Sequence, residues 1–433
     1  MRSVLFLIGF GLMTAVVKAE FVLPQPLSLQ DALAISLRHP VVMQADMQRD
    51  KVAAQQSLLA SENDLNVDFQ GQLNYVDPAP LTPDRSHNDS KVFLRFSSEL
   101  YDFGYTDARQ QALEKQLNSA SLAFMNTRQQ HQLKVAELFF EVLIADKEYV
   151  LIDEIMTAAF LDYDKLLERH DLGTVSDVDL LRLENDYREK LQLRRLAEKR
   201  QRMSRMQLAS AMGVPEHLPA DLLEPEVNWK STIPAIDQVM ETALARHPQI
   251  LAATEAVEAA RAQLAATESS DNPTLSARMQ FADYQRQTGT SHPFEMGLTL
   301  NLPLYSGGQM QAQQQQARVA LHKQELALQT AKIQAREAVL QTLLDLEEFK
   351  TELDTLKVSE DYAELYLDQN RALYELEVAS DLKDALIKVS DVILKKIKAR
   401  LGYALAEMKL AAMQGQWPLE EQTRTENTNE KTQ

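Results

Sequence analysis

Two long stretches of this 433-residue sequence contain neither proline nor glycine, residues 106–171 and residues 309–377. A helix rises 1.5 Å per residue, so about 65 helical residues extend roughly 100 Å, far beyond the usual helix of a globular domain. Apolar residues recur at threes and fours, as at Leu133, Ala136, Phe140 and Leu143. Helices with this pattern pack side by side in coiled-coil fashion. Because a further helix is expected after each stretch, at 176–212 and 380–413, the sequence predicts two long helical hairpins.

The chain also contains an internal repeat. The segment "LRHPVV" at 37–42 matches "ARHPQI" at 245–250 with an offset of 208 residues. Further pairs share an offset of 204: Tyr101 with Tyr305, Gly104 with Gly308, and Ser176-Asp177 with Ser380-Asp381. The offset changes within a turn-rich loop between residues 75 and 91, where length varies freely. Because the other spacings are constant, we interpret the pattern as a duplication rather than as chance similarity.

The repeat defines the expected organisation. In chain order the expected parts are a signal peptide (1–19), a first repeat (20–212), a proline-rich connector (213–235), a second repeat (236–413) and a polar tail (414–433). Each repeat begins with a short amphipathic helix, at 28–38 and at 236–246. A His-Pro pair then breaks the helix, since the residue before proline is pushed out of the helical region. A second helix is expected at about 41–63 and 249–270.

Each repeat then contains two segments with the alternation of β-strands. The four strands are expected at about 66–76, 91–101, 274–284 and 293–303. The segment "FEMGLTLNL" sets polar or small residues between the apolar residues Phe294, Met296, Leu298, Leu300 and Leu302. A strand has a period of two, so each segment has one apolar and one polar face. Its length of about ten residues is that of a tilted strand that crosses a bilayer.

These strands fit either a membrane or a small soluble sandwich with a buried apolar face. Two features favour the membrane. The polar faces are uncharged or mixed, as in a wet lumen, and tyrosines flank the strand ends, where an interfacial belt would place them. These are Tyr75, Tyr101, Tyr284 and Tyr305. Four strands cannot close a barrel, because an open edge in lipid leaves backbone groups unpaired and the smallest barrels have about eight strands. A membrane barrel therefore requires two or three copies. Both give an even number of strands, so the sequence does not decide between them.

Residues 1–19 have the pattern of a secretory signal: Arg2, an apolar run, and small residues before an expected cleavage after Ala19. The alternative is a retained N-terminal anchor. No cysteine is present, which excludes a disulfide framework and a thiolate metal site. No later apolar run reaches the length of a transmembrane helix. The net charge is −18, or −20 without Arg2 and Lys18, which argues against nucleic acid as a partner.

The sequence holds no recognisable catalytic constellation. It has no nucleophile elbow, no P-loop and no dinucleotide fingerprint. Its histidines are scattered, and none pairs with another at metal-ligand spacing. Its 15 methionines are dispersed, which favours core filling. We therefore expect a protein that is not an enzyme and that uses no cofactor and no metal.

Four segments resemble the TolC-like outer membrane efflux proteins. "LTLNLPLYSGGQMQAQ" at 298–313 resembles the strand-to-helix signature of that family, and "SELYDFGYTDARQ" at 98–110 resembles its counterpart in the first repeat. "SLQDALAISLRHP" at 28–40 resembles the N-terminal helix, and "ERHDLGTVSDVDLLRLE" at 168–184 resembles the helix–turn–helix tip. Each motif alone is weak, but the ordered set covers essentially the whole chain after the signal.

The resemblance implies both a fold and a function. The fold is mainly helical with a membrane β-barrel part: a homotrimer shares one barrel of twelve strands in lipid, and the hairpins continue as an α-barrel tunnel. The implied function is a passive exit duct in the outer membrane of a Gram-negative bacterium, which conducts small molecules after docking a periplasmic adaptor protein and an inner membrane transporter. Two alternatives stay open, the exit duct of a type I protein secretion system and, in another class, a soluble periplasmic coiled-coil scaffold.

The resemblance also implies candidate sites. The two tips are expected to dock the adaptor through Leu172, Gly173, Thr174, Val175, Ser176, Leu376, Glu377, Val378, Ala379 and Ser380. Acidic residues beside them either form a gating ring in the lumen or cap helices, namely Asp177, Asp179, Asp381 and Asp384. The strand–helix junctions are expected at Tyr101, Gly104, Pro303, Tyr305, Gly307 and Gly308. The second tip departs from the family pattern, because Glu377 replaces a glycine and Lys383 an aspartate.

Overall fold

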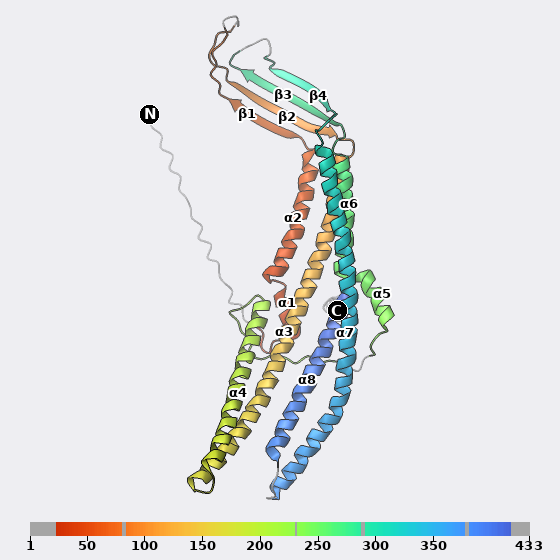
Figure 1. Cartoon of the computed structure of the whole chain (residues 1–433). Helices are drawn as coiled ribbons and strands as arrows, with labels where there is room; N and C mark the ends of the chain where they lie inside the picture. The colour runs from red at the N-terminus through yellow and green to blue at the C-terminus, as the bar shows by residue number, and fades with distance from the viewer. Residues whose placement is uncertain (1–22, 80–83, 230–231, 287–290, 377–380, 417–433) are drawn as a thin grey trace, which may run out of the picture.

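The computed structural model describes residues 23–79, 84–229, 232–286, 291–376 and 381–416. Within these ranges the chain is mainly helical with four strands, as the sequence predicts. It is elongated, with a β-sheet at one end and two helical tips at the other (Figure 1). The expected signal peptide, and the expected tail from residue 417 onward, lie outside the described residues.

The same order of elements occurs twice. The first set is α1 (Leu29–Ser36), α2 (Pro40–Glu62), β1 (Asn66–Gln72), β2 (Lys91–Tyr101), α3 (Tyr105–Asp171) and α4 (Asp177–Ala211). The second set is α5 (Ile236–Arg246), α6 (Pro248–Glu268), β3 (Thr274–Tyr284), β4 (Phe294–Asn301), α7 (Gln309–Glu375) and α8 (Leu382–Met413). At each His-Pro break the imidazole caps the next helix: Nδ1 of His39 accepts from the Val41 N–H at 3.3 Å, and Nδ1 of His247 accepts from the Gln249 N–H at 3.1 Å.

The four strands form one antiparallel sheet in the order β1-β2-β3-β4. The register places apolar side chains of all four strands in one row, made of Val67, Phe96, Met279 and Met296. The next row, on the opposite face, is polar and consists of Asp68, Arg95, Gln280 and Glu295. Within it the Arg95 guanidinium donates two hydrogen bonds to Oε1 of Gln280, each at 3.2 Å. The sheet thus has one apolar and one polar face.

The first strand is shorter than the sequence predicts. The β1–β2 ladder ends at Gln72, and Tyr75 forms only an isolated bridge with Asn88. The alternation from 73 to 76 therefore continues in sequence after the ladder pairing has stopped. No helix of the described ranges is both long and apolar enough to cross a membrane.

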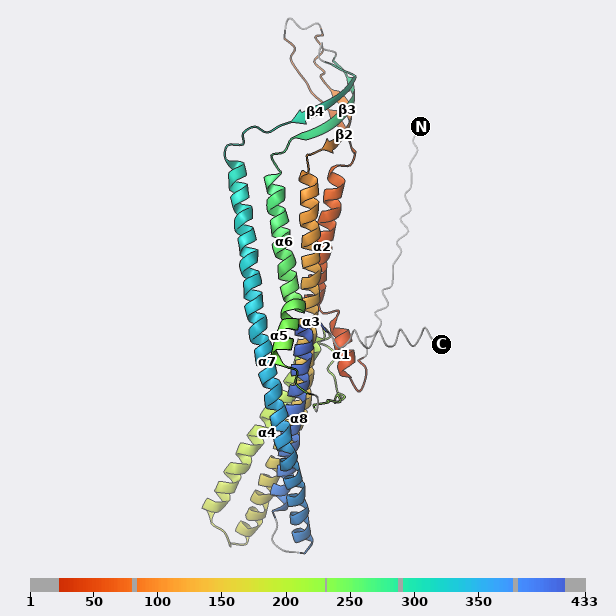
Figure 2. The ribbon, with the colours of Figure 1, turned by 90° about the vertical axis from the view of Figure 1, so that its right-hand side faces the viewer.

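The helices form a wall below the sheet. In the half next to the sheet, α2 packs on α3, α3 on α6, and α6 on α7. In the half next to the tips, α4 packs on α3, α3 on α8, and α8 on α7. Figures 1 and 2 show the two hairpins, α3–α4 and α7–α8, descending side by side. The edges of the wall are therefore α7 on one side, and α2 above α4 on the other.

Two apolar cores hold the middle of the wall together. One surrounds Phe139 of α3, with Leu208 of α4 and Leu401 of α8. The other joins Leu346 of α7 to Tyr403 of α8 and to the short helix α5. Burial of apolar area in these contacts is the main stabilising term for a fold that has no single globular interior.

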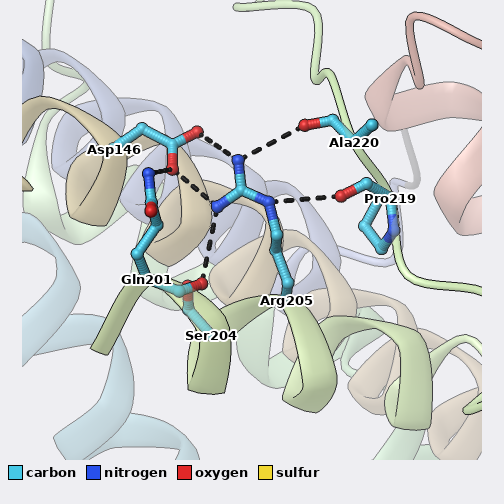
Figure 3. Close-up of polar contacts among 6 residues, drawn as sticks. All are labelled: Asp146, Gln201, Ser204, Arg205, Pro219 and Ala220. Carbon is cyan, nitrogen blue, oxygen red and sulfur yellow. Dashed lines mark hydrogen bonds and ion pairs between the residues drawn. The ribbon is translucent and has the colours of Figure 1, made fainter. Parts of the chain in front are cut away.

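A polar cluster fastens the connector to the first hairpin (Figure 3). The Arg205 guanidinium donates to both carboxylate oxygens of Asp146, at 2.6 and 2.9 Å. It also donates to the carbonyl oxygens of Pro219 and Ala220, at 3.2 and 3.3 Å. Gln201 donates to Asp146 at 2.9 Å and completes the cluster. A bidentate, partly buried pair of this kind fixes geometry as well as charge, so α3, α4 and the connector are held as one unit.

Candidate functional sites at the junctions and tips

The first strand–helix junction is a tight reversal. β2 ends at Tyr101, and Phe103 and Gly104 both have left-handed backbones, with φ of 54° and 91°. The buried Asp102 carboxylate accepts hydrogen bonds from the N–H groups of Gly104, at 3.1 Å, and of Thr106, at 2.5 Å. Asp102 thus caps the amino end of α3, which has no other side-chain cap.

The second junction reaches the same geometry without an acidic cap. β4 ends at Asn301, so Pro303 lies just beyond the strand. Gly307 and Gly308 have φ of 66° and 85°, and α7 begins at Gln309 with no side-chain cap. Tyr305 is 88% exposed. Both junctions therefore bend at glycine, but only the first is fixed by a carboxylate.

The first tip is a closed helical turn. The Gly173 N–H donates to His170 O at 2.8 Å and the Thr174 N–H donates to Arg169 O at 3.1 Å, the two bonds of a Schellman motif. Gly173 has φ of 72°, a left-handed value that favours glycine. No atom lies within 4 Å of a Cβ built on it, so backbone conformation rather than space demands glycine there. Leu172 beside it is an apolar residue that is 79% exposed.

The two acidic residues of the first tip make local contacts. Ser176 is the N-cap of α4: its hydroxyl accepts from the Asp179 N–H at 3.3 Å and donates to the Asp179 carboxylate at 2.7 Å. Oδ1 of Asp177 lies 2.7 Å from Nε2 of His170 across the turn. The Ser176 hydroxyl therefore caps α4, and each of the two carboxylates has a partner within the tip.

The second tip is described on both flanks only. Residues Glu377, Val378, Ala379 and Ser380 of the expected docking set lie outside the described residues. Leu376 ends the first flank and is exposed. On the other flank the Asp381 N–H donates to Oδ1 of the buried Asn370 at 2.8 Å, and Asn370 donates to Tyr366 O at 2.9 Å. Asp384 lies in the first turn of α8.

An ion pair joins the two hairpins close to the tips. Nζ of Lys383, at the start of α8, contacts the carboxylate of Asp162 on α3. Both side chains are partly exposed. Lys383 is one of the two residues of the second tip that depart from the family pattern, and it has an acidic partner on the other hairpin. The sequence holds no signal for this pair, because its members are 221 residues apart.

Two histidines stack in the middle of the wall. The rings of His39 and His131 lie 4.3 Å apart, and Nε2 of His131 is 2.9 Å from Ala211 O. Burial lowers the pKa of His131, and the neighbouring His39 lowers it further, against the opposing effect of the Ala211 carbonyl. Burial also lowers the pKa of His247. Among the described residues no group of three histidine, aspartate or glutamate side chains could hold a metal ion.

The second repeat matches a known family. Residues 239–416 match the family described as "OEP: Outer membrane efflux protein". Over these residues the chain is similar to the outer membrane efflux proteins. The match covers α5 from Val239, the strands β3 and β4, and the whole second hairpin with its tip. The resemblance to the TolC-like efflux proteins that the sequence motifs suggest is thereby confirmed.

Solved structures share the fold over nearly the whole chain. The Campylobacter jejuni CmeC outer membrane channel is 15% identical with a TM-score of 0.71, covering 89% of this chain and 85% of that one. The outer membrane protein VceC from Vibrio cholerae is 15% identical with a TM-score of 0.68, covering 90% and 96%. The open state of the Neisseria gonorrhoeae MtrE outer membrane channel is 17% identical with a TM-score of 0.68, covering 90% and 89%. At this identity the likeness shows the fold alone.

One curated protein is similar in sequence. Protein CyaE of Bordetella pertussis is 25% identical over 255 residues, which is 57% of this chain. The matched part spans about half of that protein, 53% of its length.

Proposed function

We propose that this chain is an exit duct of the outer membrane, in which three copies form one continuous channel from the periplasm to the outside. Conduction is passive, and energy comes from an inner membrane transporter that an adaptor connects to the tips. The observation that carries the proposal is a four-stranded sheet whose apolar face is exposed and whose two edges are unpaired within the described chain.

The exposed apolar face needs a covering. Phe69, Met296 and Leu298 are 74%, 73% and 67% exposed, and they lie on the face opposite to the polar row of Arg95. A monomeric soluble protein rarely exposes an apolar surface of this extent. Lipid covers such a face without a protein partner, which supports placement of the strands in a membrane.

The unpaired sheet edges need a partner of the same kind. β1 and β4 each present one row of unpaired backbone groups, and in lipid every such group costs several kcal/mol unless it is satisfied. Pairing β4 of one copy with β1 of the next removes both edges, and three copies close a barrel of twelve strands, within the range known for membrane barrels. The polar face then lines the lumen.

The helical wall has edges that suit the same ring. On the α7 edge, exposed apolar residues recur every seven positions in the upper half, namely Val319, Leu326, Ile333 and Leu340. On the α2 edge, Met43, Met47 and Leu58 are exposed. A seven-residue repeat is the pattern of a helix that packs against another in a coiled coil. The exposed apolar residues on both edges support packing between neighbouring copies and a closed tunnel below the barrel.

The tips are the proposed adaptor-docking surface. The first tip presents the exposed apolar residues Leu172 and Val178 around a turn with a fixed backbone. Exposed apolar side chains on a rigid support are suited to bind a partner helix. Asp162 and Lys383 link the hairpins beside this surface, so docking that separates the hairpins would also open the periplasmic end.

The test is the mass and location of the intact particle. We expect extraction from the outer membrane with detergent, and a mass of three chains. Leu298→Arg should block membrane assembly, because a charge facing mid-bilayer lipid costs roughly 2–4 kcal/mol per copy. Thr299→Arg is the matched control, since the neighbouring residue faces the other side of the strand and pairs with Ser276.

Two other outcomes are informative. A soluble particle that tolerates Leu298→Arg would overturn the proposal in favour of a periplasmic coiled-coil scaffold. The cargo is tested separately, by comparing export of small toxic compounds with secretion of a polypeptide in a deletion strain. Loss of polypeptide secretion alone would assign the duct to a type I secretion system.

A further inference from the structure

The two lower edges of the wall carry opposite charge. Residues 188–205 of α4 include eight lysine or arginine and two glutamate residues, in a chain whose net charge is −18. Residues 345–368 of α7 include nine acidic and two basic residues. The two helices lie at opposite edges of the wall (Figure 1), so these charges do not neutralise each other within one copy.

The charges form regular rows. Along α4, three exposed arginines recur every seven residues and form the α4 row: Arg188, Arg195 and Arg202. Along α7, three exposed aspartates recur every seven residues and form the α7 row: Asp354, Asp361 and Asp368. The end members of the α4 row have partners on their own helix, and Asp354 pairs with Lys357 at 2.7 Å. Arg195, Asp361 and Asp368 have no charged or hydrogen-bonded partner among the described residues.

Each row borders apolar side chains that are also exposed. On α4 these are Leu193, Leu196, Met203 and Met206. On α7 they are Leu344, Val358, Tyr362 and Leu365. An apolar stripe with charges along its flank is the pattern of a coiled-coil seam, in which flanking charges set the choice and register of the partner.

Contacts within one copy fix the heights of the rows. Arg194 of α4 contacts Asp153 of α3, and Lys383 of α8 contacts Asp162 of α3. Lys396 of α8 contacts Glu360 of α7 at 2.6 Å. We count residues along α3, α8 and α7 from each of these contacts to the next. The count places Arg195 at the height of about residue 363 of α7, roughly 3 Å along the axis from Asp361. Rotation about an axis along the tunnel preserves height, so the same level applies between copies.

The register extends to all three members of each row. α4 ascends from the tip and α7 descends towards it (Figure 1). Because both rows repeat every seven residues, an antiparallel match of Arg195 with Asp361 also sets Arg188 level with Asp368, and Arg202 level with Asp354.

Both rows face the same side of the wall. On α4 the row lies between about 110° and 150° round the helix from the side that contacts α3, at 100° per residue. On α7 the row lies between about 90° and 130° round, in the same sense, from the side that contacts α8. The two helices run in opposite directions, and the sides by which they contact the wall also point in opposite directions. The two differences cancel, so both rows point to the same face of the wall. The rows therefore meet when α7 of one copy lies beside α4 of the next.

We infer that the lower tunnel wall is closed between copies by an ionic seam, in which the α4 row of one copy pairs with the α7 row of the next. The inference rests on the proposed ring of copies and names the surface and the partner that close its periplasmic half. Arg195 and Asp361 form the central pair. Next to the sheet, the copies meet through the exposed apolar residues of α7. Nearer the tips, they meet through contacts flanked by charged pairs, which salt weakens.

Disulfide cross-linking tests the register directly, because the chain has no cysteine. Arg195→Cys combined with Asp361→Cys should give covalent multimers of the purified particle on oxidation. Arg195→Cys combined with Glu347→Cys is the matched control, since Glu347 lies on the same row line but about 21 Å further up α7. We expect cross-linking of the first pair to exceed that of the second several-fold.

Charge exchange tests the ionic character. Arg195→Asp and Asp361→Arg should each reduce, several-fold, the fraction of complete particles that survives moderate salt, and the double exchange should restore it. Arg182→Asp, which makes the same charge change on another side of α4, is the control and should have little effect.

The outcomes separate this inference from the proposed function. A three-copy particle in which the matched cysteines fail to cross-link, or in which the off-register pair cross-links equally, overturns the seam and leaves the duct. Failure of the double exchange to restore the particle overturns the ionic pairing. A single-copy particle overturns the duct and the seam together.

Discussion

The backbone of Gly402 on α8 lies directly against the ring of Phe349 on α7. A Cβ at Gly402 would meet the ring carbon Cζ at 2.5 Å and Cε1 at 2.7 Å. Glycine inside a helix costs about 1 kcal/mol relative to alanine, so its presence here is explained by this close approach. The second hairpin therefore packs as tightly as it does because position 402 has no side chain.

Gly402→Ala should lower stability despite the better helix propensity. The gain of about 1 kcal/mol from propensity is opposed by an overpacking cost of about 1–3 kcal/mol, so we expect a net loss of up to about 2 kcal/mol. Thermal unfolding of the detergent-solubilised particle measures it. Gly402→Ala with Phe349→Leu should recover most of the loss, and a stabilised single variant would contradict the packing argument.

Asp162→Ala should loosen the periplasmic end without much loss of stability. The Lys383 pair is partly exposed, so it contributes only about 0–1 kcal/mol to folding. It does tie the two hairpins together, and its removal should raise channel conductance in planar bilayers. The exchange of both residues, Asp162→Lys with Lys383→Asp, should return conductance to the wild-type level. Unchanged conductance in Asp162→Ala would remove this pair from gating.

Arg205→Ala should destabilise the first hairpin by about 2–3 kcal/mol, because the hydrogen bonds of a charged group to Asp146 and to two connector carbonyls are lost together. The Arg205 and Asp146 side chains are 19% and 31% exposed, so water replaces these bonds only in part. Proteolysis at the connector, residues 213–235, should become several-fold faster. The exposed Arg182 is the control position, and equal sensitivity of Arg182→Ala would count against the cluster.

Gly173→Pro should leave the particle assembled but abolish export. Proline cannot adopt the φ of 72° at this position, and it lacks the N–H that donates to His170 O at 2.8 Å. The Schellman turn would therefore be lost, and with it the placement of Leu172 for docking. Gly173→Asn tolerates a left-handed backbone and should retain export. Normal export by an assembled Gly173→Pro particle would show that the tip has no part in docking.

Features that depend on neighbouring residues were predictable from the sequence. The helix break before Pro40 follows from the restriction that proline places on the residue before it. The turn at Gly173 and the cap at Ser176 follow from the local chemistry of helix ends. Strand alternation also identifies the two faces of the sheet, because side chains on a strand point alternately to opposite sides.

Features that depend on distant residues were not predictable. Asp162 and Lys383 meet only because the two hairpins lie side by side, and the sequence shows Lys383 only as a departure from the family pattern. Asn370 accepts a hydrogen bond from the Asp381 N–H, but nothing in the helical pattern of α7 distinguishes it from its neighbours. The Asp102 cap did have a local signal, an aspartate three residues before the first residue of a long helix. The sequence pattern instead assigned the junction to Tyr101 and Gly104, which lie on either side of Asp102.

The buried histidines predict how stability depends on pH. Burial lowers the pKa of His131 and His247 in the folded chain, below the ordinary value of about 6.5. Near that pH the unfolded chain then binds protons that the folded chain does not, so unfolding is favoured as pH falls. The stability should be fully present above about pH 6.5. It should be lost progressively as the pH falls towards the lowered pKa values of the folded chain, by at most about 1.4 kcal/mol per pH unit for each histidine.

His131→Gln should flatten this decline in thermal unfolding between neutral and mildly acidic pH, because the substituted residue does not titrate. His322→Gln, at an exposed histidine, should leave the decline unchanged. A decline of equal steepness in His131→Gln would show that the stacked pair does not set the acid sensitivity.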